Sequence, residues 1–105
     1  MKVYPVMLKL AGRRVVVVGG GAVAARKVRL LKEMGANVTL IADKLLADVD
    51  LSGVEFIGRQ YGPEHLGRPM LVFACTDDAA LNARIADDAR AAGAIVNCVD
   101  QPEDC

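Results

Sequence analysis

Three consecutive glycines, Gly19, Gly20 and Gly21, interrupt the apolar stretch VVVVGGGAVAARKVRLLKEMGA of residues 15–36. Glycine inside regular structure costs roughly 0.5–1 kcal/mol relative to alanine, so such a cluster indicates a geometric need. In the G-x-G-x-x-G fingerprint, the first glycine permits a tight turn and the second lets a pyrophosphate approach the backbone. The third, which alanine can replace, lets helix and strand pack closely. Gly19, Gly21 and Ala24 occupy these places, with Gly20 as an extra residue, and the pattern predicts a dinucleotide site.

The segments on either side of the glycines support the interpretation of the fingerprint as a dinucleotide site. Residues 14–18 are a β-branched run typical of a strand buried on both faces. Residues 21–34 show helical periodicity, and Gly35 stands where the helix should stop. The first amides of that helix and its dipole would face a pyrophosphate. The alternative is a glycine turn required only by packing in an α/β domain without a ligand.

An acidic residue that accepts hydrogen bonds from the ribose hydroxyls is expected at the end of the second strand. Asp43 stands just past the strand-like segment NVTLIA. It could instead be a solvated loop acid or the cap of a short helix after it. Lys44 beside it could pair with an acid or tolerate a 2′-phosphate. We therefore expect NAD in preference to NADP.

The rest of the chain alternates between strands and helices. The pattern predicts strands over residues 37–42, 54–58, 70–75 and 94–99, a loop or one helical turn over 61–66, and a helix from Asp77 or Asp78 to about Ala92. Right-handed crossovers then imply an α/β, Rossmann-like, doubly wound parallel sheet of about five strands in the order 3-2-1-4-5.

Composition limits the class of protein. A chain of 105 residues fits one domain, residues 1–105, and its 13 basic and 13 acidic residues give no sign of a nucleic-acid or membrane partner. The cysteines lack metal-site or disulfide spacing, and Cys75 and Cys98 sit in apolar runs, so we expect free core thiols and no metal. The N-terminal stretch, broken by Pro5, Lys9 and Gly12, does not read as a signal peptide, which favours a cytoplasmic protein.

Two further sets of residues have ordinary explanations. The basic row of Arg26, Lys27, Arg29 and Lys32 is expected on the solvated face of the first helix, although Arg26 and Lys27 could also steer an anionic substrate. His65, the single histidine, has no ligand partner in the sequence pattern and is expected in a surface loop.

Two long segments resemble a known family. Residues 4–42, YPVMLKLAGRRVVVVGGGAVAARKVRLLKEMGANVTLIA, closely resemble the opening of the siroheme-synthase dehydrogenase module. That module is precorrin-2 dehydrogenase, and in some members it is also sirohydrochlorin ferrochelatase. Residues 73–104, FACTDDAALNARIADDARAAGAIVNCVDQPED, are similar to the second signature of the family. The positions that match this signature are Thr76, Asp77, Asn82, Asn97, Asp100 and Pro102.

The resemblance implies NAD-dependent oxidation of precorrin-2 to sirohydrochlorin, with ferrous iron as a further substrate if chelation accompanies it. The cofactor residues that it implies, together with Gly20 of the turn, are Gly19, Gly21, Ala22, Val23, Asp43, Lys44, Thr76 and Asp77. Asp100 matches the essential acid of the family and would act as the base. By sequence pattern alone, Asp100 would be a turn acid before Gln101 and Pro102.

The resemblance also has a limit. The family continues past this acid into a dimerisation region and a helical segment, which the 105 residues do not include, so we expect a fragment or short form and a homodimer at full length. Two other functions stay open. One is an NAD-sensing regulatory module without catalysis, like the ligand-gating domains of potassium transport systems. The other is a structural domain without a ligand.

Overall fold

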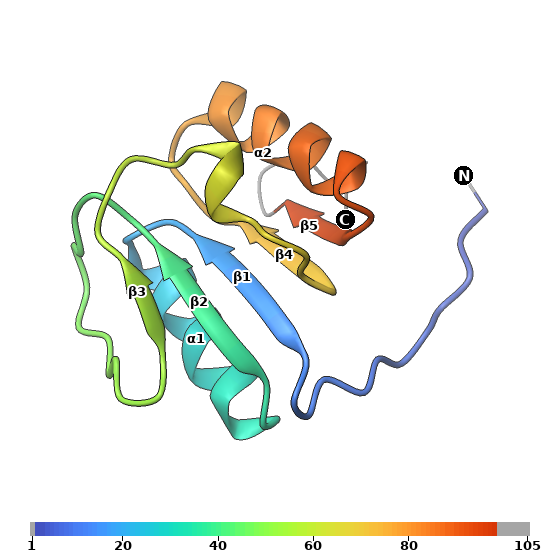
Figure 1. The fold of residues 1–105 in the computed structure, drawn as a ribbon, viewed down its shortest axis with the longest axis horizontal. Helices are drawn as coiled ribbons and strands as arrows, with labels where there is room; N and C mark the ends of the chain where they lie inside the picture. Colours follow the sequence, from blue (N-terminus) through green and yellow to red (C-terminus); the bar gives the residue numbers. More distant parts are fainter. Residues whose placement is uncertain (1, 99–105) are drawn as a thin grey trace.

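The computed structural model describes residues 2–98 of the chain. It contains five strands, two α-helices and one 3₁₀ turn (Figure 1). In chain order they are β1 (Arg14–Val18), α1 (Ala22–Glu33), β2 (Asn37–Ile41), β3 (Glu55–Ile57), η1 (Pro63–His65), β4 (Leu71–Ala74), α2 (Ala79–Ala91) and β5 (Ile95–Cys98).

The strands form one parallel sheet in the order β3-β2-β1-β4-β5, which confirms the predicted topology. β2, β3 and β4 are one or two residues shorter than predicted, and β5 begins one residue later than predicted. The predicted end of the last strand, at residue 99, lies outside the described residues. The apolar pattern continues past the ladder: the amide of Cys75 still donates to the carbonyl of Val18 at 2.8 Å, and that of Ala42 to Ile57 at 3.1 Å. Cys75 and Ala42 therefore continue the hydrogen bonding between neighbouring strands one residue beyond the ends of β4 and β2.

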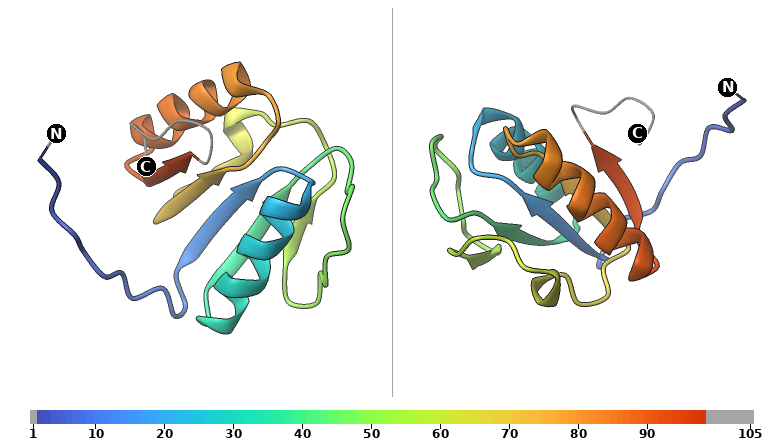
Figure 2. Two further views of the ribbon diagram at one scale, coloured as in Figure 1. Left: turned by 180° about the vertical axis from the view of Figure 1, so that it is seen from behind. Right: turned by 90° about the horizontal axis from the view of Figure 1, so that it is seen from above.

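Helices cover both faces of the sheet, as Figure 2 shows from behind and from above. Val15 and Val17 of β1 pack in one core with α1, whereas Val16 and Val18 pack in another with α2. Alternate residues of a strand point to opposite faces, so only an uninterrupted apolar run can fill both cores. The valine run therefore occupies the centre of the sheet.

Arg14 ties together three segments at the start of the strands. Its guanidinium donates to Thr39 Oγ1 at 2.8 Å and to Glu55 Oε1 at 3.0 Å. It also donates to the carbonyl of Leu66 at 3.2 Å. Thr39 in turn donates to Glu55 at 2.7 Å, and these contacts hold the pKa of Glu55 below its ordinary value, with the bond from Thr39 as the largest cause.

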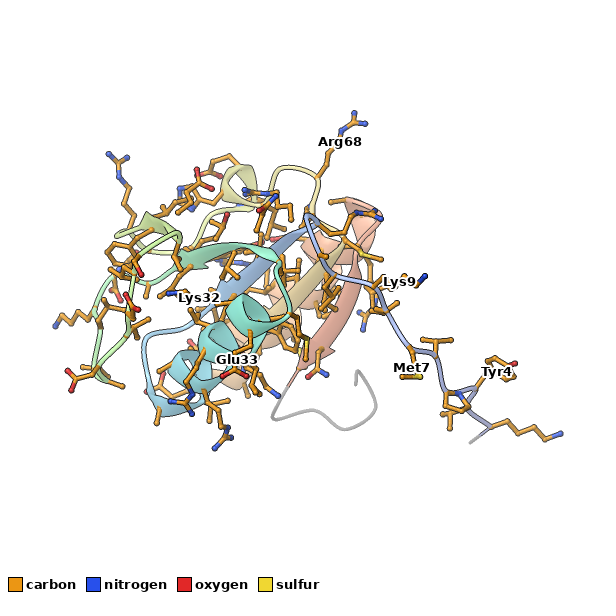
Figure 3. The ribbon with its side chains drawn as sticks, turned by 90° about the horizontal axis from the view of Figure 1, so that it is seen from below. Tyr4, Met7, Lys9, Lys32, Glu33 and Arg68 are labelled. Atoms are coloured by element: carbon orange, nitrogen blue, oxygen red, sulfur yellow. The ribbon has the colours of Figure 1, made fainter. Side chains whose placement is uncertain are left out.

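Residues 2–9 extend away from the body of the protein (Figure 3). Tyr4 and Met7 on this arm are 88% and 99% exposed, and Leu10, where the arm joins the domain, is buried in the α1 core. Within residues 2–98, no helix is both long and apolar enough to cross a membrane.

Candidate functional site

A cleft of about 1060 Å³ opens where β1, β2 and β4 end. The chain leaves β1 toward β2 on one side, and β4 lies on the other, so this is the point where ligands bind in such sheets. All nine residues predicted for the cofactor line the cleft: Gly19, Gly20, Gly21, Ala22, Val23, Asp43, Lys44, Thr76 and Asp77.

Gly19 is a glycine because of the fold. Its φ of +141° lies in a region that side chains rarely adopt, and an added Cβ would stand 2.5 Å from the carbonyl oxygen of Cys75. The turn after β1 therefore passes directly against the backbone at the end of β4. This is the tight turn that the first position of the fingerprint requires.

Gly20 is also required by neighbouring backbone. A Cβ there would overlap the carbonyl oxygen of Lys44. In the same contact, the amide of Leu46 donates to the carbonyl of Gly20 at 2.7 Å. The extra glycine of the sequence thus joins the turn to the loop after β2.

Gly21 differs from both, because a Cβ at this position would meet no heavy atom within 4 Å. Its backbone, with φ −94° and ψ −169°, is extended and open to any residue. No contact within residues 2–98 therefore calls for glycine here. The free space above it fits the close approach of a ligand that the fingerprint predicts at its second position.

The start of α1 fits an anionic ligand. No side chain caps it and its first turn holds no acid, whereas the start of α2 is capped by Asp78, which accepts from the amide of Leu81 at 3.1 Å. The amides of Ala22 and Val23 border the cleft at the positive end of the α1 dipole. A diphosphate thus matches the donors of this cleft.

Asp43 and Lys44 line the cleft from the loop after β2, which contacts the glycine turn at Gly20, and both are exposed. No helix occurs between Ile41 and Glu55, so the alternative in which Asp43 caps a short helix is excluded. No ion pair of Lys44 occurs among residues 2–98. Both side chains are therefore accessible to a ligand in the cleft.

Thr76 is held by Asn82, a residue to which sequence analysis gave no role. Asn82 is fully buried; its Oδ1 accepts from the Thr76 hydroxyl at 2.6 Å and from the Thr76 amide at 3.1 Å. Its Nδ2 donates to the Thr76 carbonyl at 3.0 Å. These three hydrogen bonds from one buried side chain of α2 fix the loop after β4. Asp77, the next residue in this loop, is exposed at the cleft.

The cleft has a further wall that the sequence analysis did not predict. Arg59, Gln60 and Tyr61, which follow β3, line the cleft together with Arg84 of α2. Tyr61 donates to Asp88 Oδ2 at 2.7 Å, and burial, followed by this bond, raises the pKa of Tyr61 above its ordinary value. The sequence signal that could have found this wall is the position of Arg59 and Tyr61 just after a strand.

The other expectations have mixed outcomes. Asp100 lies outside the described residues. Cys75 and Cys98 are buried, as predicted. Within residues 2–98, no group of three or more His, Cys, Asp or Glu side chains could hold a metal ion. His65 is in the 3₁₀ turn, where its Nδ1 accepts from the amide of Gly62 at 3.1 Å.

The basic row of α1 is not uniformly solvated. The Nζ atom of Lys27 lies 5.5 Å from the centre of the Phe73 ring, a cation–π distance. Lys32, labelled in Figure 3, donates to the carbonyl of Asp50 at 3.1 Å. Both lysines reach partners on neighbouring segments through their long aliphatic side chains. The helical periodicity of the sequence does not predict such contacts.

Comparisons with known proteins agree with this geometry. A family model described as "Putative NAD(P)-binding" matches residues 6–105. The chain is 44% identical to the siroheme synthase of Ectopseudomonas mendocina (strain ymp) and 43% identical to that of Chromobacterium violaceum, over 100% and 98% of its own length. It spans 23% of each of these relatives.

A solved structure also shares the fold. SirC, a precorrin-2 dehydrogenase, superposes with a TM-score of 0.79 at 29% identity, over 91% of this chain and 50% of the SirC chain. The parallel five-stranded architecture is therefore shared with half of the SirC chain.

Proposed function

Because this chain belongs to the NAD(P)-binding family whose model spans residues 6–105, we propose that it is the cofactor domain of an enzyme that oxidises precorrin-2 to sirohydrochlorin with NAD. The observation that carries the proposal is the open cleft at Gly21, bordered by every residue predicted for the cofactor. The likeness to siroheme synthases and to SirC supports the choice of substrate.

The chain's residues would hold the cofactor in three places. The amides of Ala22 and Val23 donate to the diphosphate, and the bare backbone of Gly21 lets it approach. Asp43 accepts from the hydroxyls of the adenosine ribose, with Lys44 beside it. Thr76 and Asp77 line the path along the end of β4.

Oxidation of a reduced tetrapyrrole removes a hydride and a proton. When bound, NAD supplies the hydride acceptor. The proton requires a base, and the carboxylate of Asp100, two residues after Cys98 in the sequence, accepts it in this proposal. The same carboxylate would take pyrrole N–H protons if ferrous iron is inserted as a second substrate. We propose a homodimer at full length and a cytoplasmic location for the enzyme.

The test uses the full-length protein with Asp100→Ala and, as matched control, Asp48→Ala in an exposed loop. Removing the base should lower the rate of NADH formation from precorrin-2 by about 10²-fold or more, while calorimetry shows unchanged NAD binding. The control should keep full activity. Near-normal turnover of the Asp100 variant would remove this residue from the mechanism. NADH binding without any spectral response to a tetrapyrrole, even in the wild type, would instead favour a regulatory sensor.

A further inference from the structure

The wall formed by Tyr61 and Arg84 has no part in the function proposed above. The guanidinium carbon of Arg84 lies 5.8 Å from the centre of the Tyr61 ring, within cation–π range. The Tyr61 hydroxyl donates to Asp88, one turn further along α2. Two contacts to the same helix therefore fix the ring, and Arg84 rests on a rigid surface.

Arg84 itself is exposed and lines the cleft. Within residues 2–98, its guanidinium forms no ion pair with an acid. A guanidinium is planar, so stacking on Tyr61 occupies one of its faces. The other face is available to a second flat group that enters the cleft.

The position of this wall identifies which group that would be. In the parallel register, Ile41 of β2 faces Ile57 of β3. Asp43 and Arg59 therefore each stand two residues beyond neighbouring strand ends, and Tyr61 stands two residues after Arg59. The wall thus continues from the side of the cleft that holds Asp43.

We propose that Tyr61 and Arg84 form an adenine shelf: the purine stacks on the Arg84 guanidinium, which is itself supported by the Tyr61 ring. The inference rests on the proposed function only in taking an adenine dinucleotide as the ligand of the cleft. Stacking on an arginine plane is independent of base-edge hydrogen bonds, so it secures the adenosine half while Asp43 reads the ribose. Arg84 is a positioning residue, since it touches the cofactor far from the hydride that moves.

The experiment uses the full-length protein with Arg84→Ala, and Arg29→Ala on the exposed face of α1 as control. Calorimetric titrations use ADP-ribose, which carries the adenine, and nicotinamide mononucleotide, which does not. Loss of the stack should raise the Kd for ADP-ribose about fivefold or more and leave that for nicotinamide mononucleotide unchanged. In turnover, the KM for NAD should rise by the same factor with kcat unaltered.

A third variant separates stacking from charge. Arg84→Lys keeps the cation and loses the plane, so its Kd for ADP-ribose should stay close to that of Arg84→Ala. Recovery of wild-type affinity in Arg84→Lys would overturn the shelf in favour of simple attraction of the diphosphate. Unchanged ADP-ribose binding by Arg84→Ala, or equal weakening of both probes, would overturn it as well.

These outcomes are distinct from failure of the proposed function. If the wild-type protein binds ADP-ribose with the predicted dependence on Arg84 but does not oxidise precorrin-2, the shelf stands and the enzymatic proposal falls. If the wild type binds no ADP-ribose at all, the shelf falls with it.

Discussion

The amide of Leu46 donates a 2.7 Å hydrogen bond to the carbonyl of Gly20. This bond fastens the loop after β2 to the glycine turn after β1, and Asp43 and Lys44 lie within the fastened stretch. The loop after β2 and the glycine turn are therefore in direct backbone contact at this point. This contact sets how far Asp43 lies from the start of α1.

Replacing Gly20 with alanine should damage the fold. The new Cβ overlaps the carbonyl of Lys44, so the loop after β2 must shift and weaken the bond from Leu46. We expect a loss of about 1–3 kcal/mol in the free energy of unfolding, measured by urea denaturation. An unchanged midpoint would show that the two backbones are not in contact in solution.

Replacing Gly21 with alanine should weaken NAD binding and leave the fold intact. Its Cβ would meet no heavy atom of residues 2–98 within 4 Å, and the gain from a less flexible unfolded chain is offset by the loss of glycine at the N-cap of α1, so the free energy of unfolding should change by less than about 1 kcal/mol. The same methyl group occupies the space above the start of α1, so NAD affinity should fall at least tenfold by calorimetry. If NAD binds this variant as tightly as wild type, the diphosphate does not lie over Gly21.

Asp43→Ser tests the choice between NAD and NADP. Removing a carboxylate that accepts from ribose hydroxyls should weaken NAD binding about tenfold, because bonds to charged groups contribute about 1.5–3 kcal/mol. Binding of NADP should change little or improve, since the repulsion of a 2′-phosphate is gone. Titrations of both cofactors, with Asp48→Ser as the exposed control, give the ratio. If the ratio of the Kd values for NAD and NADP did not change, Asp43 would be a solvated loop acid that does not contact the ribose.

Asn82→Ala should destabilise the protein and loosen the loop after β4. The buried amide that serves three atoms of Thr76 is lost, which costs about 1–3 kcal/mol for the groups left without a partner. Asn37→Ala is the matched control, because that side chain donates only to the Gly12 carbonyl on the exposed surface and should cost less than about 0.5 kcal/mol. If the two substitutions lowered the thermal unfolding midpoint equally, the hydrogen bonds of Asn82 to Thr76 would not be what stabilises this loop.

Glu55 should make stability depend on acid pH. Hydrogen bonds from Thr39 and Arg14 hold its folded-state pKa below the ordinary 4.5. The stabilisation is therefore present above pH 4.5 and is lost as the pH falls through the lower, folded-state pKa. In Glu55→Gln, the free energy of unfolding measured from about pH 6 down to pH 3 should fall less steeply than in wild type. Parallel curves would mean that the Arg14 cluster gains nothing from the ionised carboxylate.

Much of the fold follows from short-range patterns. A valine run that serves two cores, helices that end at glycines, and parallel crossovers lead to the strand order without any knowledge of contacts. The strand ends were less predictable, because Ala42 and Cys75 continue the apolar pattern and the hydrogen bonding after the ladder has ended. The glycine fingerprint and the acid after β2 could be predicted because both sit at fixed offsets from strand ends.

The sequence by itself determined the architecture, the cleft-lining glycines and the side of the sheet on which a ligand would lie, since each depends on residues close together in the chain. Only the tertiary structure decided why each glycine is there: Gly19 and Gly20 face the backbone of Cys75 and Lys44, and Gly21 faces open space. It also brought Tyr61 against Arg84 and Asn82 under Thr76. The first pairing depends on how the segment after β3 packs against α2, and such contacts between elements leave no periodic trace along the chain. The second depends on how the loop after β4 folds back onto the start of α2, which apolar periodicity does not specify.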